Sequence, residues 1–407
     1  MPGVNTKLFM AVMGLVYLLF NPKNLVVDFI NKNIIALSLW ASVFSLICFA
    51  SVILNGTSDF TYATYVVSMF VWLFAAFLLI NLIQSVHGYV SIQLLTNYVV
   101  SVSVIQCLCT LLLEYNVNFL DFVKNHQFGL TLLYECEDRL QGIAAAIDPA
   151  GIRFAAILVM LGYVAVNHTN WNRIIWIAYL LAFIFITIIG NMISRTTVVG
   201  TLLAIVYWGG IMIFGKSDQK KETATIFKYL IVLLIASLSI VIFYYNTDLD
   251  FRENLRFGFE GFFSLVEKGT WEVYSNDILK SMIKFPESFK TWIIGDGYID
   301  NPTNGSDPYY VGEHYKGYYM NVDIGYLRFI FYCGIIGLFT FTGFFLYVVK
   351  CSIDRLSKNK MLPILLLLLN FIIWFKVSTD VFQFFALLLC LPKLYELKDN
   401  KAIAYVA

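Results

Sequence analysis

An apolar run of about 40 residues between Arg173 and Lys216 contains a single charged residue, Arg195. A helix crosses the roughly 30 Å hydrocarbon core of a bilayer with about 20 residues, so the run is long enough for two crossings. A charge in the middle of a crossing costs several kcal/mol, whereas a charge between two crossings reaches the interface. Residues 190–194 include glycine, asparagine and serine, which favour a turn. We therefore expect two helices, with Arg195 at their junction.

The whole chain has the composition of a polytopic membrane protein. Hydrophobic residues make up 59% of its 407 residues, charged residues 14%, and the mean hydropathy is +0.74. The net charge is +1 and no block of lysine and arginine occurs, which excludes a nucleic-acid-binding surface. The first apolar stretch lacks a clear small-residue cleavage site, so we interpret it as a retained helix.

Apolar segments of membrane-spanning length recur along the chain and predict an all-α fold with about eleven transmembrane helices. They lie near residues 6–22, 34–54, 63–83, 96–113, 152–167, 173–192, 196–214, 226–245, 323–348, 361–375 and 378–392.

Lysine and arginine set the predicted orientation. They concentrate in the loops 215–225 and 350–360 and in the C-terminal tail, which places these segments in the cytoplasm. The longer segments 114–151 and 246–322 then lie on the outer side. The predicted organisation is residues 1–245 with eight spans and the smaller outer segment 114–151, residues 246–322 as a large outer loop, and residues 323–407 with three spans and the tail.

The large outer loop has two parts. Apolar side chains at spacings of three to four residues over 251–266 and 271–285 predict amphipathic helices at the membrane surface. The stretch from Thr291 to Asn321 is rich in Gly, Asn, Asp and Tyr and predicts a loop. Its tyrosines form either an interfacial belt or stacking platforms for sugar rings, with Tyr309, Tyr310 and Tyr315 as the sugar-binding candidates.

Several outer arginines are candidates for binding a phosphorylated headgroup. Arg195 is either a snorkelling side chain or a guanidinium that binds a phosphate or pyrophosphate in two-pronged fashion. Arg252 and Arg256 are spaced i, i+4 on a predicted helix and could act on one ligand. The alternative for Arg252 is an ion pair on a solvated helix face with Glu253 or Glu260.

Two residues are candidates for proton transfer. His314 lies in the large loop beside Glu313, and Asp323 lies at the start of the next span. An acid at the rim of a membrane helix is costly unless it is used or paired. Asp323 is therefore either a general base or a helix N-cap.

Four segments, in order, resemble bacterial O-antigen polymerases and O-antigen ligases over roughly residues 139–340. "RLQGIAAAIDPAGIRFAAIL" resembles the family's first outer-loop pattern and "MISRTTVVGTLL" its Ser-Arg motif at the opening of a span. "TWIIGDGY" resembles the Gly-x-Gly element of the large loop. "VDIGYLRFIFYCGIIGLFTF" resembles the acid or histidine, Tyr-Leu and Gly-x-x-Gly that open the following span.

The resemblance implies a GT-C-like helical fold in the bacterial inner membrane, with a periplasmic active site and large periplasmic loop. It implies an inverting glycosyltransferase that joins undecaprenyl-pyrophosphate-linked oligosaccharides without a metal or other cofactor. A polysaccharide chain-length regulator is a further implied partner. Arg195 and Arg139 carry over by motif as pyrophosphate-binding residues, with Arg195 stabilising the charge that develops on the leaving group.

Departures from the family pattern bear on the choice of reaction. Ligases carry histidine where this chain has Asp323, which favours the polymerase. Thr270 follows Gly269 where many relatives have Gly-Arg, and the spacing from Arg139 to Gly151 is one residue longer than the polymerase pattern. The alternatives are an O-antigen ligase that moves finished glycan to lipid A core and a lipid-linked oligosaccharide flippase.

Overall fold

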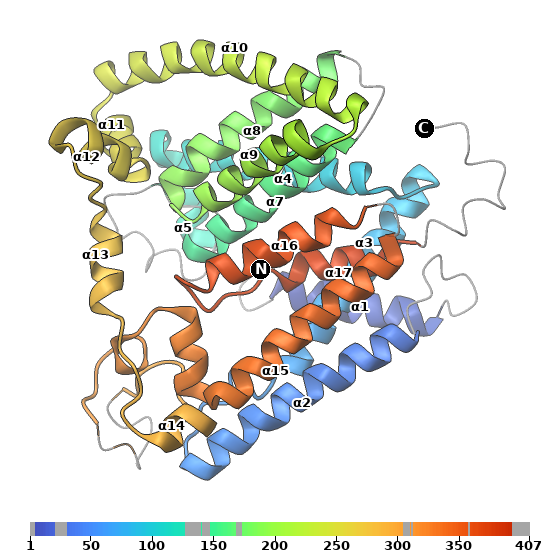
Figure 1. Cartoon of the computed structure of the whole chain (residues 1–407), viewed down its shortest axis with the longest axis vertical. Helices are drawn as coiled ribbons and strands as arrows, with labels where there is room; N and C mark the ends of the chain where they lie inside the picture. Colours follow the sequence, from blue (N-terminus) through green and yellow to red (C-terminus); the bar gives the residue numbers. More distant parts are fainter. Residues whose placement is uncertain are drawn as a thin grey trace. The chain divides into compact units, whose positions relative to one another are not determined.

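The computed structural model describes residues 5–20, 31–126, 140, 147–167, 173–303, 310, 312–356 and 359–392. Every regular element in these ranges is a helix, and the isolated β-bridge found there joins Asp300 to Tyr318. Figure 1 shows this helical architecture. The predicted all-α class is confirmed.

Within the described ranges, eight helices are long and apolar enough to cross a membrane. Each matches a predicted span: α2 (Lys32–Asn55), α3 (Tyr65–His87), α4 (Ile92–Tyr115), α7 (Ile147–Asn167), α8 (Arg173–Ile193), α9 (Thr197–Phe214), α10 (Ser217–Thr247) and α15 (Gly325–Leu356). The architecture is that of a multi-pass membrane protein.

The other three predicted spans are shorter helices. They are α1 (Thr6–Phe20), α16 (Met361–Ile373) and α17 (Phe382–Cys390), with 15, 13 and 9 residues. At about 1.5 Å per residue, even α1 extends only about 22 Å, less than the roughly 30 Å apolar core. The count of eleven crossings and the GT-C likeness stay predictions.

The chain forms two compact units. Unit 1 contains Ser91–Tyr274, and unit 2 combines Val4–Val90 with Ser275–Ala407. The boundary falls inside the predicted large loop, so the first part of that loop belongs to unit 1 and the later part to unit 2. The two compact units therefore do not coincide with the three segments predicted from the membrane topology.

Small residues let the helices of unit 1 pack closely around α7, which is buried along most of its length. A Cβ atom on Gly200 of α9 would lie 2.2 Å from the carbonyl oxygen of Ala155 in α7. Two turns further, Trp208 donates from Nε1 to the carbonyl of Gly162 at 2.8 Å. Close backbone approach and hydrogen bonds are what hold helices together in lipid, where apolar burial contributes little. By contrast, α10 keeps most of its side chains exposed.

Unit 1 also includes the shorter helices α5 (Val117–His126), α11 (Leu249–Gly258) and α12 (Glu260–Lys268). The prediction of one amphipathic helix over 251–266 is wrong in this respect, because Phe259 leaves the helical conformation with φ −120° and ψ 25°. Asp248 begins α11, where its carboxylate accepts a hydrogen bond from the Phe251 N–H at 2.9 Å. The second predicted amphipathic helix is present as the shorter α13 (Tyr274–Ser281).

Unit 2 has an aromatic core. In Figure 1, α2 and α15 run side by side. Phe44 of α2 stacks on Phe341 of α15 with ring centroids 4.2 Å apart, and Trp374 stacks on Phe341 at 5.2 Å. All three side chains are fully buried, so the two ends of the chain share one core.

Unit 2 also contains short helices where the sequence predicts only a loop. These are α14 (Phe289–Ile294) and the 3-10 helix η1 (Tyr319–Asn321). Ser288 begins α14, and its hydroxyl accepts from the Thr291 N–H at 3.0 Å. The loop prediction is therefore wrong at Thr291–Ile294, where this local cap outweighs the glycines that follow.

Candidate functional site

Arg195 lies between two helices, as the length of the apolar run predicts. α8 ends at Ile193 and α9 begins at Thr197, so the connection is only three residues long. Gly190 is still helical, and its missing side chain makes room for Thr197, whose hydroxyl donates to the Gly190 carbonyl at 3.0 Å. This contact draws the start of α9 against the end of α8 and fixes the junction.

The guanidinium of Arg195 is held by residues of α11 and α12. Nη2 lies 2.7 Å from Oε2 of Glu260, and Nε donates to the Phe257 carbonyl at 2.9 Å. The Phe257 ring lies beneath the guanidinium, with its centroid 4.0 Å from the guanidinium carbon. The break at Phe259 brings the last turn of α11 and the first turn of α12 to one side chain. Arg195 is only 15% exposed, whereas Glu260 is 32% exposed.

The other two described arginines of the predicted pyrophosphate site make different contacts. Arg252 donates from Nε to the Tyr245 carbonyl at 2.7 Å, which satisfies a carbonyl in the last turn of α10. Arg256 forms a two-pronged ion pair with Glu267, both distances being 2.7 Å, and donates to the Tyr245 hydroxyl at 3.0 Å.

Both guanidiniums thus fasten α11 to α10 or α12, and Glu260, one predicted partner of Arg252, pairs with Arg195. Their pyrophosphate role stays a prediction, and Arg139 lies outside the described residues.

In unit 2, Asp323 precedes α15 and is paired with an arginine that the sequence reading did not single out. Its Oδ1 lies 3.7 Å from Nη1 of Arg328, whose side chain is 10% exposed. Arg328 could have been found by the criterion used for Arg195, because it is a charge within a predicted span.

Antiparallel pairing between two pieces of the large loop brings further groups to Arg328. The Asn301 N–H donates to the Gly317 carbonyl at 2.7 Å, and Asp300 forms a β-bridge with Tyr318. Asp300 Oδ1 lies 3.1 Å from Nη2 of Arg328, and the Tyr318 ring centroid lies 4.1 Å from the guanidinium carbon. The first turn of α15 is thereby tied to the loop.

The remaining predicted site residues of unit 2 lie in this loop. Tyr310 donates to Oδ1 of Asn301 at 3.0 Å, and its ring lies edge-on to His314 with centroids 5.3 Å apart. Nδ1 of His314 lies 3.0 Å from the Pro302 carbonyl, which can only accept, so Nδ1 is the donor in this contact. Tyr315 donates to the Tyr318 carbonyl at 3.2 Å.

Tyr309 lies outside the described residues. The catalytic and sugar-binding roles of His314, Tyr310 and Tyr315 stay predictions.

The Gly-Asp-Gly element has a clear structural task. α15 is interrupted at Gly334, where φ is 66° and ψ is −176°, so carbonyls before the break lose their helical partners. The Asp296 N–H donates to the Phe331 carbonyl at 2.6 Å, and the Gly297 N–H donates to the Tyr332 carbonyl at 3.1 Å. Non-helical backbone at a membrane helix is tolerated where such partners are supplied.

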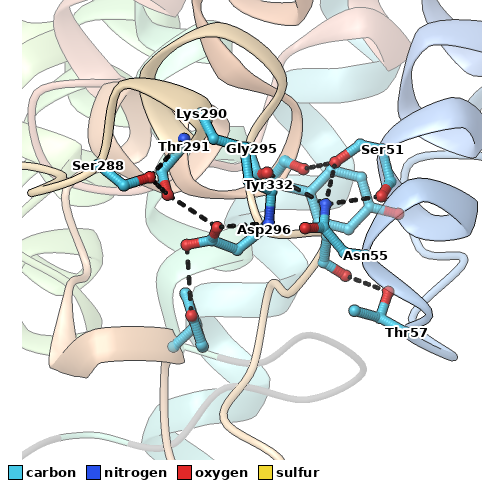
Figure 2. A network of polar contacts seen from close by, with 11 residues as sticks. Ser51, Asn55, Thr57, Ser288, Lys290, Thr291, Gly295, Asp296 and Tyr332 are labelled. Atoms are coloured by element: carbon cyan, nitrogen blue, oxygen red, sulfur yellow. Dashed lines mark hydrogen bonds and ion pairs between the residues drawn. The ribbon is translucent and has the colours of Figure 1, made fainter. Parts of the chain in front are cut away.

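Figure 2 shows how α2 joins this junction. Ser51 donates to the Tyr332 carbonyl at 2.7 Å, and Asn55 donates to the Gly295 carbonyl at 3.1 Å. The Asp296 carboxylate turns the other way and accepts from the Thr291 hydroxyl at 2.8 Å. The turn after α14 is therefore locked between α2 and α15.

No family model, curated protein or solved structure matches this chain. The functional argument therefore rests on the residues and contacts described above.

Proposed function

We propose that this protein is a metal-independent, inverting glycosyltransferase that polymerises undecaprenyl-pyrophosphate-linked repeat units at the periplasmic face of a bacterial inner membrane. The observation that carries the proposal is the setting of Arg195. A partly buried guanidinium lies at a helix junction, is aligned by the Phe257 carbonyl and ring, and has a more exposed carboxylate, Glu260, as its ion-pair partner.

Glu260 is the group that a pyrophosphate would replace. Glu260 is the more exposed of the two side chains, at 32% against 15%, although its Oε2, which contacts Arg195, is buried. Arg195 then makes two-pronged contacts with the phosphate oxygens, and its charge opposes the negative charge that grows on the leaving group. The Phe257 contacts keep the guanidinium oriented through the exchange, so little reorganisation is needed during reaction.

The proposed reaction balances as a single displacement. The acceptor hydroxyl oxygen of the next lipid-linked unit bonds to C1 of the donor glycan, on the face opposite the pyrophosphate. The C1–O bond to pyrophosphate breaks, and its electron pair leaves with the lipid pyrophosphate. The hydroxyl proton passes to a general base, for which Asp323 and His314 are the candidates from the sequence.

A complementation experiment in the native host tests the proposal. The gene is deleted and replaced by wild type, Arg195→Ala, Arg195→Lys or Lys268→Ala, and surface glycan is separated by length. Lys268 is the matched control, because it is an exposed α12 cation paired with Glu272. We expect Arg195→Ala to abolish long chains, Arg195→Lys to retain a fraction of them, and Lys268→Ala to resemble wild type.

The deletion strain separates the polymerase from its alternatives. Loss of a polymerase leaves one repeat unit on the acceptor, whereas loss of a ligase leaves none. Loss of a flippase keeps lipid-linked units on the cytoplasmic side. Normal chain length in Arg195→Ala cells that contain wild-type amounts of inserted protein would contradict the proposed role of Arg195.

A further inference from the structure

Arg328 stands between two carboxylates of unequal exposure. Its Nη1 lies 3.7 Å from Asp323 Oδ1, and its Nη2 lies 3.1 Å from Asp300 Oδ1. Asp323 is 18% exposed and Asp300 is 68% exposed, while Arg328 itself is 10% exposed. The mostly buried guanidinium of Arg328 therefore lies beside one mostly buried carboxylate, Asp323, and one exposed carboxylate, Asp300.

Only part of the guanidinium of Arg328 forms hydrogen bonds with the described residues, and those bonds fix its orientation. Among the described residues, its buried Nε has no hydrogen-bond partner, and its guanidinium lies over the Tyr318 ring. Nη2 also donates to the Ile299 carbonyl at 3.3 Å, so both the backbone and the side chain of the loop hold the same end of the guanidinium. The loop fixes Nη2, and Nη1 is left directed at Asp323.

We propose that Arg328 is a positioning residue for the glycosyl transfer: it keeps Asp323 ionised and aimed as the base, while Asp300 shares the charge of the same guanidinium. This inference rests on the proposed function. A cation within about 4–6 Å favours the charged form of a carboxylate, and a base must be ionised to accept a proton. The weaker contact with Asp323 suits this task, because a short two-pronged pair would lower the basicity of the carboxylate further.

Other charged or titratable groups lie on the elements around the start of α15. They are Asp59 before α3, Lys290 on α14, Asp296 after it, Tyr319 in η1, and Lys376 with Asp380 between α16 and α17. None of these side chains is replaced in the variants of Arg328. A change in the titration of Asp323 between these proteins is therefore attributable to Arg328.

The first measurement is the pH dependence of polymerisation by purified full-length protein in proteoliposomes. In Arg328→Gln we expect a lower kcat, little change in KM, and an acid limb displaced to higher pH by about one unit or more. Arg328→Lys restores part of kcat. Asp300→Asn moves the acid limb to lower pH, because Arg328 then serves Asp323 alone. Lys316→Gln, an exposed lysine in the same loop, is the control and leaves the profile unchanged.

The second measurement does not need activity. Infrared difference titration, with Asp323→Asn as the subtraction reference, follows the protonated carboxyl band of Asp323. We expect this band to appear at higher pH in Arg328→Gln than in wild type, and at lower pH in Asp300→Asn. Identical titrations in all three proteins overturn the inference.

Failure of the proposed function has a different signature, namely no ladder of longer glycans from folded wild-type protein in the same proteoliposomes. Should Arg328→Gln not fold, Asp300→Asn decides the matter, because an acid limb and a carboxyl band that stay at their wild-type pH overturn the inference.

Discussion

The backbone N–H of Gly297 donates to the carbonyl of Tyr332 at 3.1 Å, so a turn of the large loop supplies a hydrogen bond that α15 loses at its break. Gly295 and Gly334 both adopt positive φ, at 78° and 66°, and their backbones meet without side chains between them. The Gly-Asp-Gly element, which resembles a family motif, thus also supplies hydrogen-bond donors to α15 at its break.

Gly334→Ala should unfold unit 2 more easily. Its Cβ would lie 2.0 Å from the Ile293 carbonyl oxygen, and its φ of 66° is unfavourable for alanine. We expect the free energy of unfolding to fall by at least about 2 kcal/mol. Thermal unfolding of the detergent-solubilised protein measures this. Gly209→Ala is the control, since a Cβ there meets open space in α9; equal melting temperatures for the two variants would contradict the described junction.

Ser51→Ala should lower the free energy of unfolding by less than Gly334→Ala does. The variant removes the Ser51 hydrogen bond, but the Gly297 N–H still satisfies the Tyr332 carbonyl. We expect a loss of about 1 kcal/mol in chemical denaturation. Ser38→Ala is the comparison, because that hydroxyl bonds only within its own helix, to the Ile34 carbonyl, among the bonds described. An equal effect of the two substitutions would mean that α2 does not support the break.

The Arg256–Glu267 pair should give unit 1 a weak acid sensitivity. Hydrogen bonds from Arg256 lower the pKa of the Glu267 carboxyl. A lowered carboxyl pKa in the folded state stabilises the fold above the unfolded value, near pH 4, and the contribution disappears as the pH falls through the lowered pKa. The melting temperatures of wild type and Glu267→Gln should differ slightly at pH 7 and converge in acid. A difference that persists in acid would show that the pair is not its source.

Gly200→Leu should separate α7 from α9. Even a Cβ at this position would lie 2.2 Å from the Ala155 carbonyl oxygen, so α9 must move and take the Arg195 junction with it. We expect shorter glycan chains and a lower melting temperature, whereas Gly210→Leu, which faces open space, keeps both. Unchanged chain length despite a displaced α9 would weaken the link between the junction and activity.

Apolar length alone predicted the eight long helices and the junction at Arg195, because both depend on the thickness of a bilayer. The break at Gly334 was not predicted, since the run around it is continuously apolar and its hydrogen-bond partners are distant in sequence. The break at Phe259 was missed for a similar reason. The apolar spacing continues through it, while the contacts of Arg195 with both flanking turns are tertiary.

The candidate site was predictable where charge stands out against an apolar background. Arg195 and Asp323 were found in this way, and Arg328 met the same criterion. What the sequence could not supply is pairing: Glu260 with Arg195, Glu267 with Arg256, and Asp300 with Arg328 all join segments whose proximity depends on the fold.

The most direct test is polymerisation by the purified protein in proteoliposomes that contain lipid-pyrophosphate-linked repeat units and no other enzyme. The account predicts a ladder of longer lipid-linked glycans with wild type, and only the starting unit with Arg195→Ala. No ladder from folded wild-type protein, or the same ladder from both proteins, would contradict it.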